Sequence, residues 1–261
     1  MRDRVLSTMS RLVLASVFFV AFETFPSGTQ TFPSPRPLIL IDPGHGGADK
    51  GSSYHDLLES ELALNTALKI QEIHLRQKIK TYSVELTRNT DRWMDLEERL
   101  RIVNHRKPSL VISIHYNSSY DERAKGAEIF TLEKLTGVQR QGFLASLSSP
   151  APELFEASIP DVILKDLERR NQILRSREFA KHLQQALRTT DVQTVRTKEA
   201  EFQILGSSYP SVLLEAGFLS NASDRKAIIK DQSAGSNAKK ILEAIGSWIK
   251  TTNVVSSRDE N

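Results

Sequence analysis

The 261-residue chain contains no cysteine. Disulfide bonds, thiolate-bound zinc and cysteine nucleophiles are therefore excluded together. A lipid-anchored lipoprotein is excluded as well, because the chain offers no cysteine to acylate. Any transition-metal site in this protein must be built from histidine, aspartate or glutamate side chains.

A strong charge of either sign is also missing. The 35 Lys and Arg residues nearly balance the 32 Asp and Glu residues, which leaves a formal net charge of +3. No basic run with interleaved aromatic residues occurs, so we expect no nucleic acid partner. The length suits one α/β domain with extensions, or at most two small domains.

The N-terminus lacks a hydrophobic run long enough for a comfortable membrane span. The apolar run Leu12–Phe22 follows three arginines and precedes a segment rich in Pro, Ser and Thr. This pattern is typical of a secretory signal, but no Ala-x-Ala cleavage site follows it, so an uncleaved anchor stays open. We predict a signal peptide or anchor at 1–25 and a linker at 26–36. The protein is then exported to the periplasm or cell envelope and meets a membrane only through an uncleaved N-terminus.

Short apolar runs alternate with segments of helical periodicity through residues 37–252. This alternation predicts an α/β fold whose sheet is covered on both faces. We expect the tail 253–261 to be disordered. The expected strands are Leu38–Ile41, Val84–Thr87, Leu110–Ile114, Ala127–Leu132 and Val212–Leu214. The expected helices are Glu59–Arg76, Leu96–Asn104, one through Phe179, Leu183 and Leu187, and closing helices at Ile228 and Ile241–Ile249.

One segment, 133–175, is too long for an ordinary connection between a strand and a helix. It contains Ser148–Pro152 and then a run with helical spacing, Asp161–Ile173. Long insertions beside an active site are often lids. A surface excursion without a role is the alternative, and the sequence favours neither.

Three polar residues stand where an expected strand runs out. His45 follows the first strand in a Pro-Gly-His-Gly-Gly turn, His115 follows the third, and Glu215 follows the last. In open α/β sheets, ligands bind at the carboxyl ends of the strands. Each residue alone has a structural alternative, as a hydrogen-bonded histidine or a glutamate paired with an arginine. Together they predict one shared site.

Glu59 begins the helix that follows His45. A carboxylate there also suits the positive end of the helix dipole, and Glu61 competes with it for a metal role. Two histidines and one carboxylate supply the three protein ligands of an open zinc site. A hydrolase built on such a site needs a general base, and Glu215 is the candidate, because partial burial raises the pKa of a carboxyl group toward the working range.

Five stretches of the chain carry a pattern of motifs in a fixed order. They are Ile41–Gly47; Glu59–Asn65; Thr87 and Arg88 with Asp91, Leu96, Arg99 and Asn104; Ser113–Asn117; and Pro210–Asn221. With these motifs the chain resembles the catalytic domain of the zinc-dependent N-acetylmuramoyl-L-alanine amidases of the bacterial cell wall. The resemblance covers roughly Pro37 to Thr251.

The resemblance implies a three-layer α/β/α domain with a mixed, mostly parallel central sheet. It implies one Zn²⁺ ion held by His45, Glu59 and His115, with Glu215 as the catalytic glutamate. The implied substrate is peptidoglycan, cut at the amide between N-acetylmuramic acid and the first L-alanine of the stem peptide, in cell separation or wall remodelling. Nothing in the sequence demands more than a monomer.

Three residues depart from the family's pattern. Ser60 replaces the usual Lys after the metal-binding Glu, and Lys50 stands where Pro is common. Tyr116 replaces the usual Ala beside His115, where its ring would narrow the cleft or stack on a sugar. None of these departures removes a ligand.

In some division-associated members of the family, a helix in the region of the 133–175 insertion blocks the zinc site until an activator protein displaces it. Glu153 or Glu156 is the candidate blocking carboxylate here. Other readings stay open. They are a non-catalytic or autoinhibited wall-binding homologue, a zinc exopeptidase acting on free peptides, and an envelope protein that uses metal for stability alone.

Overall fold

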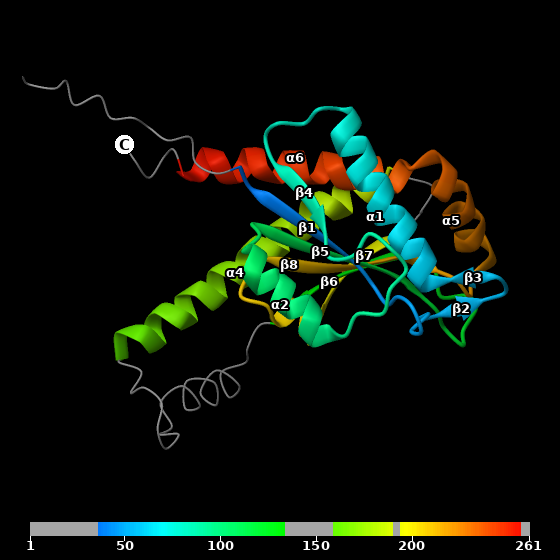
Figure 1. Ribbon diagram of the computed structural model, residues 1–261, viewed down its shortest axis with the longest axis horizontal. Helices are drawn as coiled ribbons and strands as arrows, with labels where there is room; N and C mark the ends of the chain where they lie inside the picture. The colour runs from blue at the N-terminus through cyan, green and yellow to red at the C-terminus, as the bar shows by residue number, and fades with distance from the viewer. Residues whose placement is uncertain (1–35, 134–158, 190–193, 257–261) are drawn as a thin grey trace, which may run out of the picture. The chain divides into compact units, whose positions relative to one another are not determined.

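The structure, a computed structural model, describes residues 36–133, 159–189 and 194–256 (Figure 1). The predicted signal peptide or anchor, the predicted linker apart from Arg36, and the candidate blocking residues Glu153 and Glu156 lie outside these ranges. No helix within them has both the length and the apolar character needed to cross a membrane.

Six strands form the central sheet in the order β4-β1-β5-β8-β6-β7. Neighbouring strands run parallel except for β6 and β8, which pair antiparallel. The predicted mixed, mostly parallel sheet is therefore confirmed. The strands are β1 (Leu38–Pro43), β4 (Ser83–Leu86), β5 (Leu110–Asn117), β6 (Ala127–Leu132), β7 (Val195–Ala200) and β8 (Ser211–Phe218).

Helices flank the sheet on both sides (Figure 1). Two of them begin at side-chain caps: Asp95 accepts a hydrogen bond from the backbone of Glu98, and Asn221 accepts two from the first turn of its helix. Such caps satisfy backbone N–H groups that have no partner inside the helix. The helices are α1 (Glu59–Arg76), α2 (Leu96–Arg106), α4 (Ile159–Leu187), α5 (Ala222–Ala234), α6 (Ser236–Ser256) and the 3-10 helix η1 (Gln203–Gly206).

Strand residues alternate between two apolar layers, one on each face of the sheet. Ile41, Ile112 and Leu214 pack in the larger cluster, which also holds side chains of α1, α4 and α6. Their neighbours Leu40 and Val111 pack in the smaller cluster, with side chains of α2 and η1. Because successive side chains of a strand point to opposite faces, this alternation also decides where the polar residues of β5 and β8 point.

Three predicted strands are shorter than the strands of the structure, and the first of them, β1, continues to Pro43. β5 continues to Asn117 and β8 continues to Phe218. His115 and Glu215 therefore lie inside strands rather than in the loops that follow them. The two residues are register partners in the parallel pairing of β5 with β8.

The sequence reading missed β7 and the small hairpin of β2 (Ser53–Tyr54) and β3 (Leu57–Leu58). In β7, Val195 is buried but Arg196–Glu199 are exposed. Charged, exposed residues of this kind are typical of an edge strand, and they leave no apolar run that a sequence pattern can detect.

Helix α4 joins two segments that the sequence reading kept apart. It unites the helical run predicted at Asp161–Ile173 with the helix predicted through Phe179 and Leu187. The second part of the predicted 133–175 insertion is therefore the first half of this helix, and 134–158 lie outside the described ranges. At the other end of the chain, α6 continues to Ser256, into the predicted tail.

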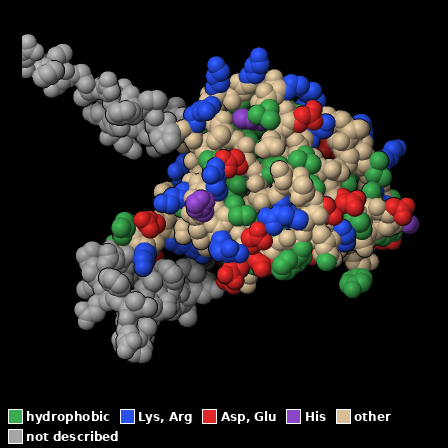
Figure 2. All heavy atoms as spheres, in the orientation of Figure 1, with side chains coloured by type: hydrophobic (Ala, Val, Ile, Leu, Met, Phe, Trp, Pro, Cys, Tyr) green, Lys and Arg blue, Asp and Glu red, His purple; other side chains and the backbone are tan. Residues whose placement is uncertain are grey.

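Charges of both signs are mixed on the surface. On the face shown in Figure 2, Lys and Arg side chains are distributed among Asp and Glu. This mixture agrees with the small net charge of +3.

Phe179 tests the packing of α4 against the larger core cluster. Its side chain is 0% exposed, and its ring meets that of Trp248 edge-on at 5.8 Å. We expect Phe179→Ala to lower the free energy of unfolding by about 3–5 kcal/mol, because it leaves a cavity. Leu174→Ala in the same helix is the control, since Leu174 is 65% exposed. Equal urea midpoints for the two variants would contradict this packing.

Candidate active site

Three side chains from separate segments converge at the carboxyl edge of the sheet. Nε2 of His45 lies 3.1 Å from Oε1 of Glu59, and Nδ1 of His115 lies 2.8 Å from the same oxygen. The three potential donor atoms all lie within 4.8 Å of one another. Two imidazole nitrogens and one carboxylate oxygen at this spacing are a donor set that fits a zinc ion.

His45 is held in an unusual backbone conformation. Its φ of 55° falls in the left-handed region, which residues with a side chain adopt uncommonly. Nδ1 of His45 lies 2.8 Å from Oδ2 of Asp49, so the other ring nitrogen faces Glu59. A carboxylate on the far nitrogen of a metal-binding histidine fixes its tautomer and its ring orientation.

Two glycines allow the backbone to approach the convergent side chains. A Cβ atom at Gly44 would overlap the ring of His115. At Gly51, whose φ is +64°, a Cβ atom would lie 2.5 Å from Oε2 of Glu59 and from Cδ2 of His45. The main chain therefore forms a wall of the site, and only glycine leaves room there for the two rings.

Arg88 connects two segments through hydrogen bonds: the loop that contains His45, and the start of α1. Its Nη2 atom donates hydrogen bonds to the carbonyl oxygen of Gly44 at 2.7 Å and to that of Ser60 at 2.9 Å. The side chain is buried. Because Gly44 precedes His45 and Ser60 follows Glu59, one guanidinium group fixes the distance between two of the three convergent residues.

Arg99 ties the same loop to the end of β1. Nη1 of Arg99 lies 2.6 Å from Oδ1 of Asp42, and Nη2 donates to the carbonyl oxygen of His45 at 2.6 Å. Asp42 is buried and also accepts hydrogen bonds from Thr87 and Ser113. A buried charge is tolerated only when it is paired and fully hydrogen-bonded, and Asp42 satisfies both conditions.

The positioning roles of Asp42, Arg88 and Arg99 were missed by the sequence reading. Arg88 and Arg99 were part of the family pattern, and Asp42 was part of its first motif, but none was given a task. One signal was present for Arg88. It stands directly after the expected strand Val84–Thr87, and residues at the carboxyl ends of strands commonly lie near the ligand in open α/β sheets. Helical spacing places Arg99 on the same side as Leu96 and Val103, a signal that the sequence reading did not use.

Electrostatics favour a charged Glu59 next to a charged His45. Burial by itself raises the pKa of Glu59, but hydrogen bonds and charges from His115 and His45 hold that pKa well below its usual range. Burial lowers the pKa of His45, yet Glu59 and Asp49 more than offset it and raise the pKa to about 9. Glu61, the competing carboxylate, is exposed, so only Glu59 reaches the site.

Glu215 stands beside this cluster on the neighbouring strand. Burial raises the pKa of Glu215 to about 7, and the charges of Glu59 and Glu128 act in the same direction against that of His115. Glu128, on β6, is the register partner of Glu215. The carboxylate of Glu128 forms an ion pair with Lys198 at 2.6 Å. Oε2 of Glu215 is buried and has no hydrogen-bond partner among the described residues. This carboxyl group can therefore hold or release a proton near neutral pH.

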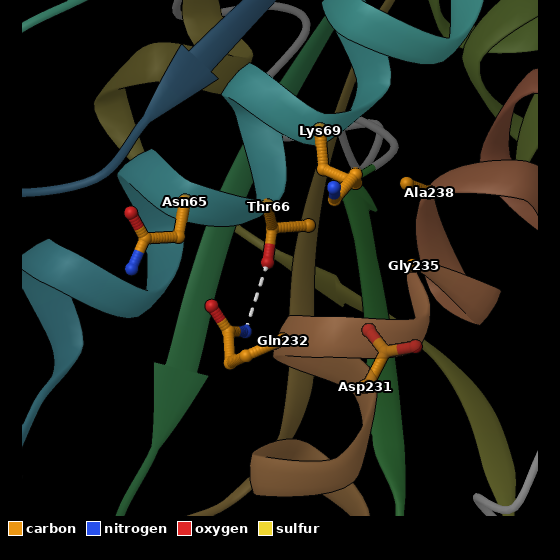
Figure 3. Close-up of a pocket in the computed structure, with 7 residues that line it drawn as sticks. All are labelled: Asn65, Thr66, Lys69, Asp231, Gln232, Gly235 and Ala238. Atoms are coloured by element: carbon orange, nitrogen blue, oxygen red, sulfur yellow. Dashed lines mark hydrogen bonds between the residues drawn. The ribbon is translucent and has the colours of Figure 1, made fainter.

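Tyr116 does not line the site, so its predicted role in narrowing the cleft or stacking on a sugar is wrong. Its side chain is 1% exposed, and its hydroxyl lies 2.8 Å from that of Thr66. Gln232 donates to both hydroxyl groups at 3.4 Å, and Figure 3 shows Gln232 and Thr66 pointing toward each other between α5 and α1. Because residues of β5 alternate between faces, Tyr116 points away from the side that His115 faces.

The departure at Lys50 is part of a small network. Its Nζ atom lies 2.8 Å from Oδ2 of Asp91, and Oδ1 of Asp91 accepts a hydrogen bond from the backbone of Gly47 at 2.9 Å. The other departure, Ser60, is buried and contributes its carbonyl oxygen to Arg88. Only Lys50 therefore supports the loop that carries His45 through its side chain, since any residue at position 60 would supply the same carbonyl oxygen.

Residues 39–247 match the Amidase_3 family, described as N-acetylmuramoyl-L-alanine amidase. The match covers most of the chain, so the chain belongs to this family of amide hydrolases, and the predicted family and enzyme class are confirmed. A putative N-acetylmuramoyl-L-alanine amidase of Buchnera aphidicola (from Acyrthosiphon pisum) is 29% identical over 75% of this chain and 87% of that protein. AmiC of Neisseria meningitidis is 27% identical to this chain, and the similarity covers 83% of this chain and 54% of AmiC.

Solved structures of amidases share the fold. The N-acetylmuramoyl-L-alanine amidase of Clostridium difficile 630 superposes with a TM-score of 0.61 at 23% identity, over 83% of this chain and 98% of that one. The CwlD amidase of Clostridioides difficile, solved in complex with the GerS lipoprotein, superposes with a TM-score of 0.61 at 21% identity. The superposition covers 83% of this chain and 100% of that one. These similarities confirm the predicted three-layer architecture.

Gly44→Ala tests the close approach of the backbone to His115. We expect the added methyl group to push the imidazole aside and to weaken zinc binding by roughly 10–100-fold, the size of other changes that disturb the orientation of a metal ligand. Competition with a chromophoric chelator measures the affinity. Gly246→Ala is the control, because a Cβ atom there meets nothing within 4 Å. Unchanged zinc affinity in Gly44→Ala would argue against the site.

Arg99→Met tests the buried ion pair. The substitution removes the positive charge from Asp42 and leaves the carbonyl oxygen of His45 without its donor, so we expect a loss of about 3–5 kcal/mol in the free energy of unfolding. Arg101→Met is the matched control, because Arg101 lies in the same helix and is exposed. Chemical denaturation followed by circular dichroism measures both. A difference below about 1 kcal/mol between them would rule out a stabilising role for the pair.

Proposed function

We propose that this protein cleaves the amide between N-acetylmuramic acid and the L-alanine of the stem peptide in peptidoglycan, with one zinc ion as cofactor. His45, Glu59 and His115 would hold the ion, and Glu215 would be the general base. The observation that carries the proposal is the convergence of three donor atoms within 4.8 Å beside a buried carboxyl group of raised pKa. Membership of the amidase family supports the same reaction.

The residues of the site divide the chemical work between them. When bound, zinc supplies Lewis-acid chemistry, which lowers the pKa of water and polarises a carbonyl group. Glu215 accepts the proton of the attacking water and passes it to the nitrogen of the departing L-alanine. A pKa near 7 suits both halves of this transfer, because the same group must first act as a base and then as an acid.

Positioning residues keep the other groups ready for this step. Asp49 holds the ring of His45 with Nε2 toward the site, and the depressed pKa of Glu59 keeps its carboxylate charged. Ser52 donates a backbone hydrogen bond to Glu59 at 2.7 Å and fixes the second carboxylate oxygen. Ligands fixed in this way need little rearrangement before reaction.

The substrate places the protein in the cell envelope. Peptidoglycan lies outside the cytoplasmic membrane, so the protein must be exported, in agreement with the predicted signal peptide or anchor at 1–25. Action in the periplasm, a role in cell separation or wall remodelling, and a monomeric state are part of this proposal. An activator that displaces Glu153 or Glu156 from the zinc remains a prediction, since both glutamates lie outside the described residues.

The alternatives differ from this proposal in chemistry. A non-catalytic wall-binding homologue would have no need for a donor set beside a buried carboxyl group of raised pKa, and the presence of both supports the hydrolase instead. A zinc exopeptidase would use the same ligands on free peptides, because substrate identity is not determined by the ligands alone. A comparison of substrates with and without the muramic acid separates the proposed amidase from such an exopeptidase.

Mass spectrometry of the products from purified peptidoglycan tests the proposal. We expect the protein to release free stem peptides that begin with L-alanine, and expect a chelator to abolish the release. Glu215→Gln keeps the size of the side chain but removes the base, and should lower kcat about a hundredfold to ten-thousandfold. Glu61→Gln, at an exposed position of α1, should leave kcat unchanged.

Two results would contradict the proposal. Release of stem peptides by Glu215→Gln at the wild-type rate would remove the general base from the mechanism. Cleavage of free peptides in preference to peptidoglycan would favour the exopeptidase.

A further inference from the structure

Trp93 is an exposed aromatic residue beside the site. The chain has two tryptophans, and they differ sharply: the side chain of Trp248 is 1% exposed, whereas that of Trp93 is 57% exposed. Trp93 lies in the loop between β4 and α2. This loop leaves the sheet at the same carboxyl edge as the loop of His45, since β4 and β1 are parallel neighbours.

The backbone of Trp93 touches the loop that carries His45. A Cβ atom added to Gly47 would lie 2.9 Å from Cβ and 3.0 Å from Cα of Trp93. Gly47 is two residues from His45 in the sequence. The indole is therefore exposed to solvent on a loop that packs against the loop of His45.

The loop around Trp93 is fixed on both sides. Before it, Asp91 binds the backbone of Gly47 and the side chain of Lys50. After it, Met94 is 5% exposed and Asp95 caps α2. An exposed indole on a rigid loop loses little conformational freedom when it binds a ligand, and tryptophans in such positions often dominate binding energy.

We propose that Trp93 is a platform on which a sugar ring of the glycan strand stacks, so that it positions the substrate for cleavage. This inference rests on the proposed peptidoglycan substrate. A pyranose ring of an N-acetylated sugar has a face of C–H groups and a polar rim. An indole matches it with a flat apolar face and a hydrogen-bonding N–H group.

Other exposed aromatic residues fit this role less well. The Tyr120 side chain is 110% exposed, so nothing holds its ring in place. Phe202 packs its ring edge-on against Phe130 at 5.1 Å and lies after β7, whose direction is opposite to that of β8. Phe202 is therefore at the other edge of the sheet. Among these exposed aromatic residues, all of them in the described part of the chain, Trp93 is the one that lies on a fixed loop in contact with the loop of His45.

The fluorescence of Trp93 tests this proposal directly. The probe is a peptide-free glycan oligosaccharide of alternating N-acetylglucosamine and N-acetylmuramic acid, added to the full chain carrying Glu215→Gln. We expect a saturable blue shift and at least a twofold fall in quenching by acrylamide, because the sugar covers the indole. Trp248 is buried and contributes a constant signal. A free stem peptide without sugar should leave the spectrum unchanged.

Substitutions of Trp93 separate stacking from a nonspecific change. In the same Glu215→Gln background, Trp93→Phe should lose the fluorescence response but still sediment with insoluble peptide-free glycan, since a phenyl ring also stacks. Trp93→Ala should bind that glycan about tenfold more weakly. Leu75→Ala is the control. Leu75 is 68% exposed and lies 16 residues after Glu59 in α1, about 24 Å along the helix.

Three outcomes would overturn the inference: no change in the fluorescence of Trp93 at saturating glycan, equal glycan binding by Trp93→Ala and Leu75→Ala, or a response to the free peptide instead. These outcomes are distinct from failure of the proposed function, because binding is measured without cleavage. Release of stem peptides that depends on Glu215, with no response of Trp93 to glycan, would overturn the inference alone. A response of Trp93 without any release would support the platform and overturn the proposed reaction.

Discussion

The buried ion pair between Asp42 and Arg99 is the interaction on which the site depends. The carboxylate of Asp42 collects hydrogen bonds from α2, from Thr87 after β4 and from Ser113 of β5, while Arg99 extends the network to the carbonyl oxygen of His45. Removing either charge leaves the other buried without its opposite charge, which is strongly unfavourable. The core of the sheet therefore sets the position of the loop, and the loop sets the position of the imidazole.

Three buried or half-buried carboxyl groups lie close together at this edge, and each meets a different environment. Glu59 is surrounded by two histidines, and Glu128 is paired with Lys198 at 2.6 Å. Glu215 stands between them and has one oxygen without a hydrogen-bond partner in the described structure. Pairs of titratable groups whose environments separate their pKa values divide acid–base roles in this way. At Glu215 the pKa is raised to about 7, mainly by burial.

Much of the fold was predictable because the strands β1, β5 and β8 are buried on both faces and read as continuous apolar runs. The edge strand β7 has no such run and was missed. At the site, the residue types at strand ends indicated His45, His115 and Glu215, but the position of Tyr116 was misjudged. The alternation of a strand already places Tyr116 on the face opposite to His115, so this error was avoidable. The spacing of Arg99 from Leu96 and Val103 also indicated its inward side, but its ion pair with Asp42 arises from a tertiary contact that the sequence does not signal.

The hydrogen bonds that Arg88 and Arg99 donate to the His45 loop go to its carbonyl oxygens and not to its side chains. A carbonyl oxygen is present whatever residue occupies the position, so these four hydrogen bonds do not depend on the side chains of the loop. Space sets the stricter limit, because a Cβ atom at Gly44 or Gly51 would overlap the convergent side chains. Substitutions in the loop are therefore restricted by the room that its glycines leave rather than by the arginines.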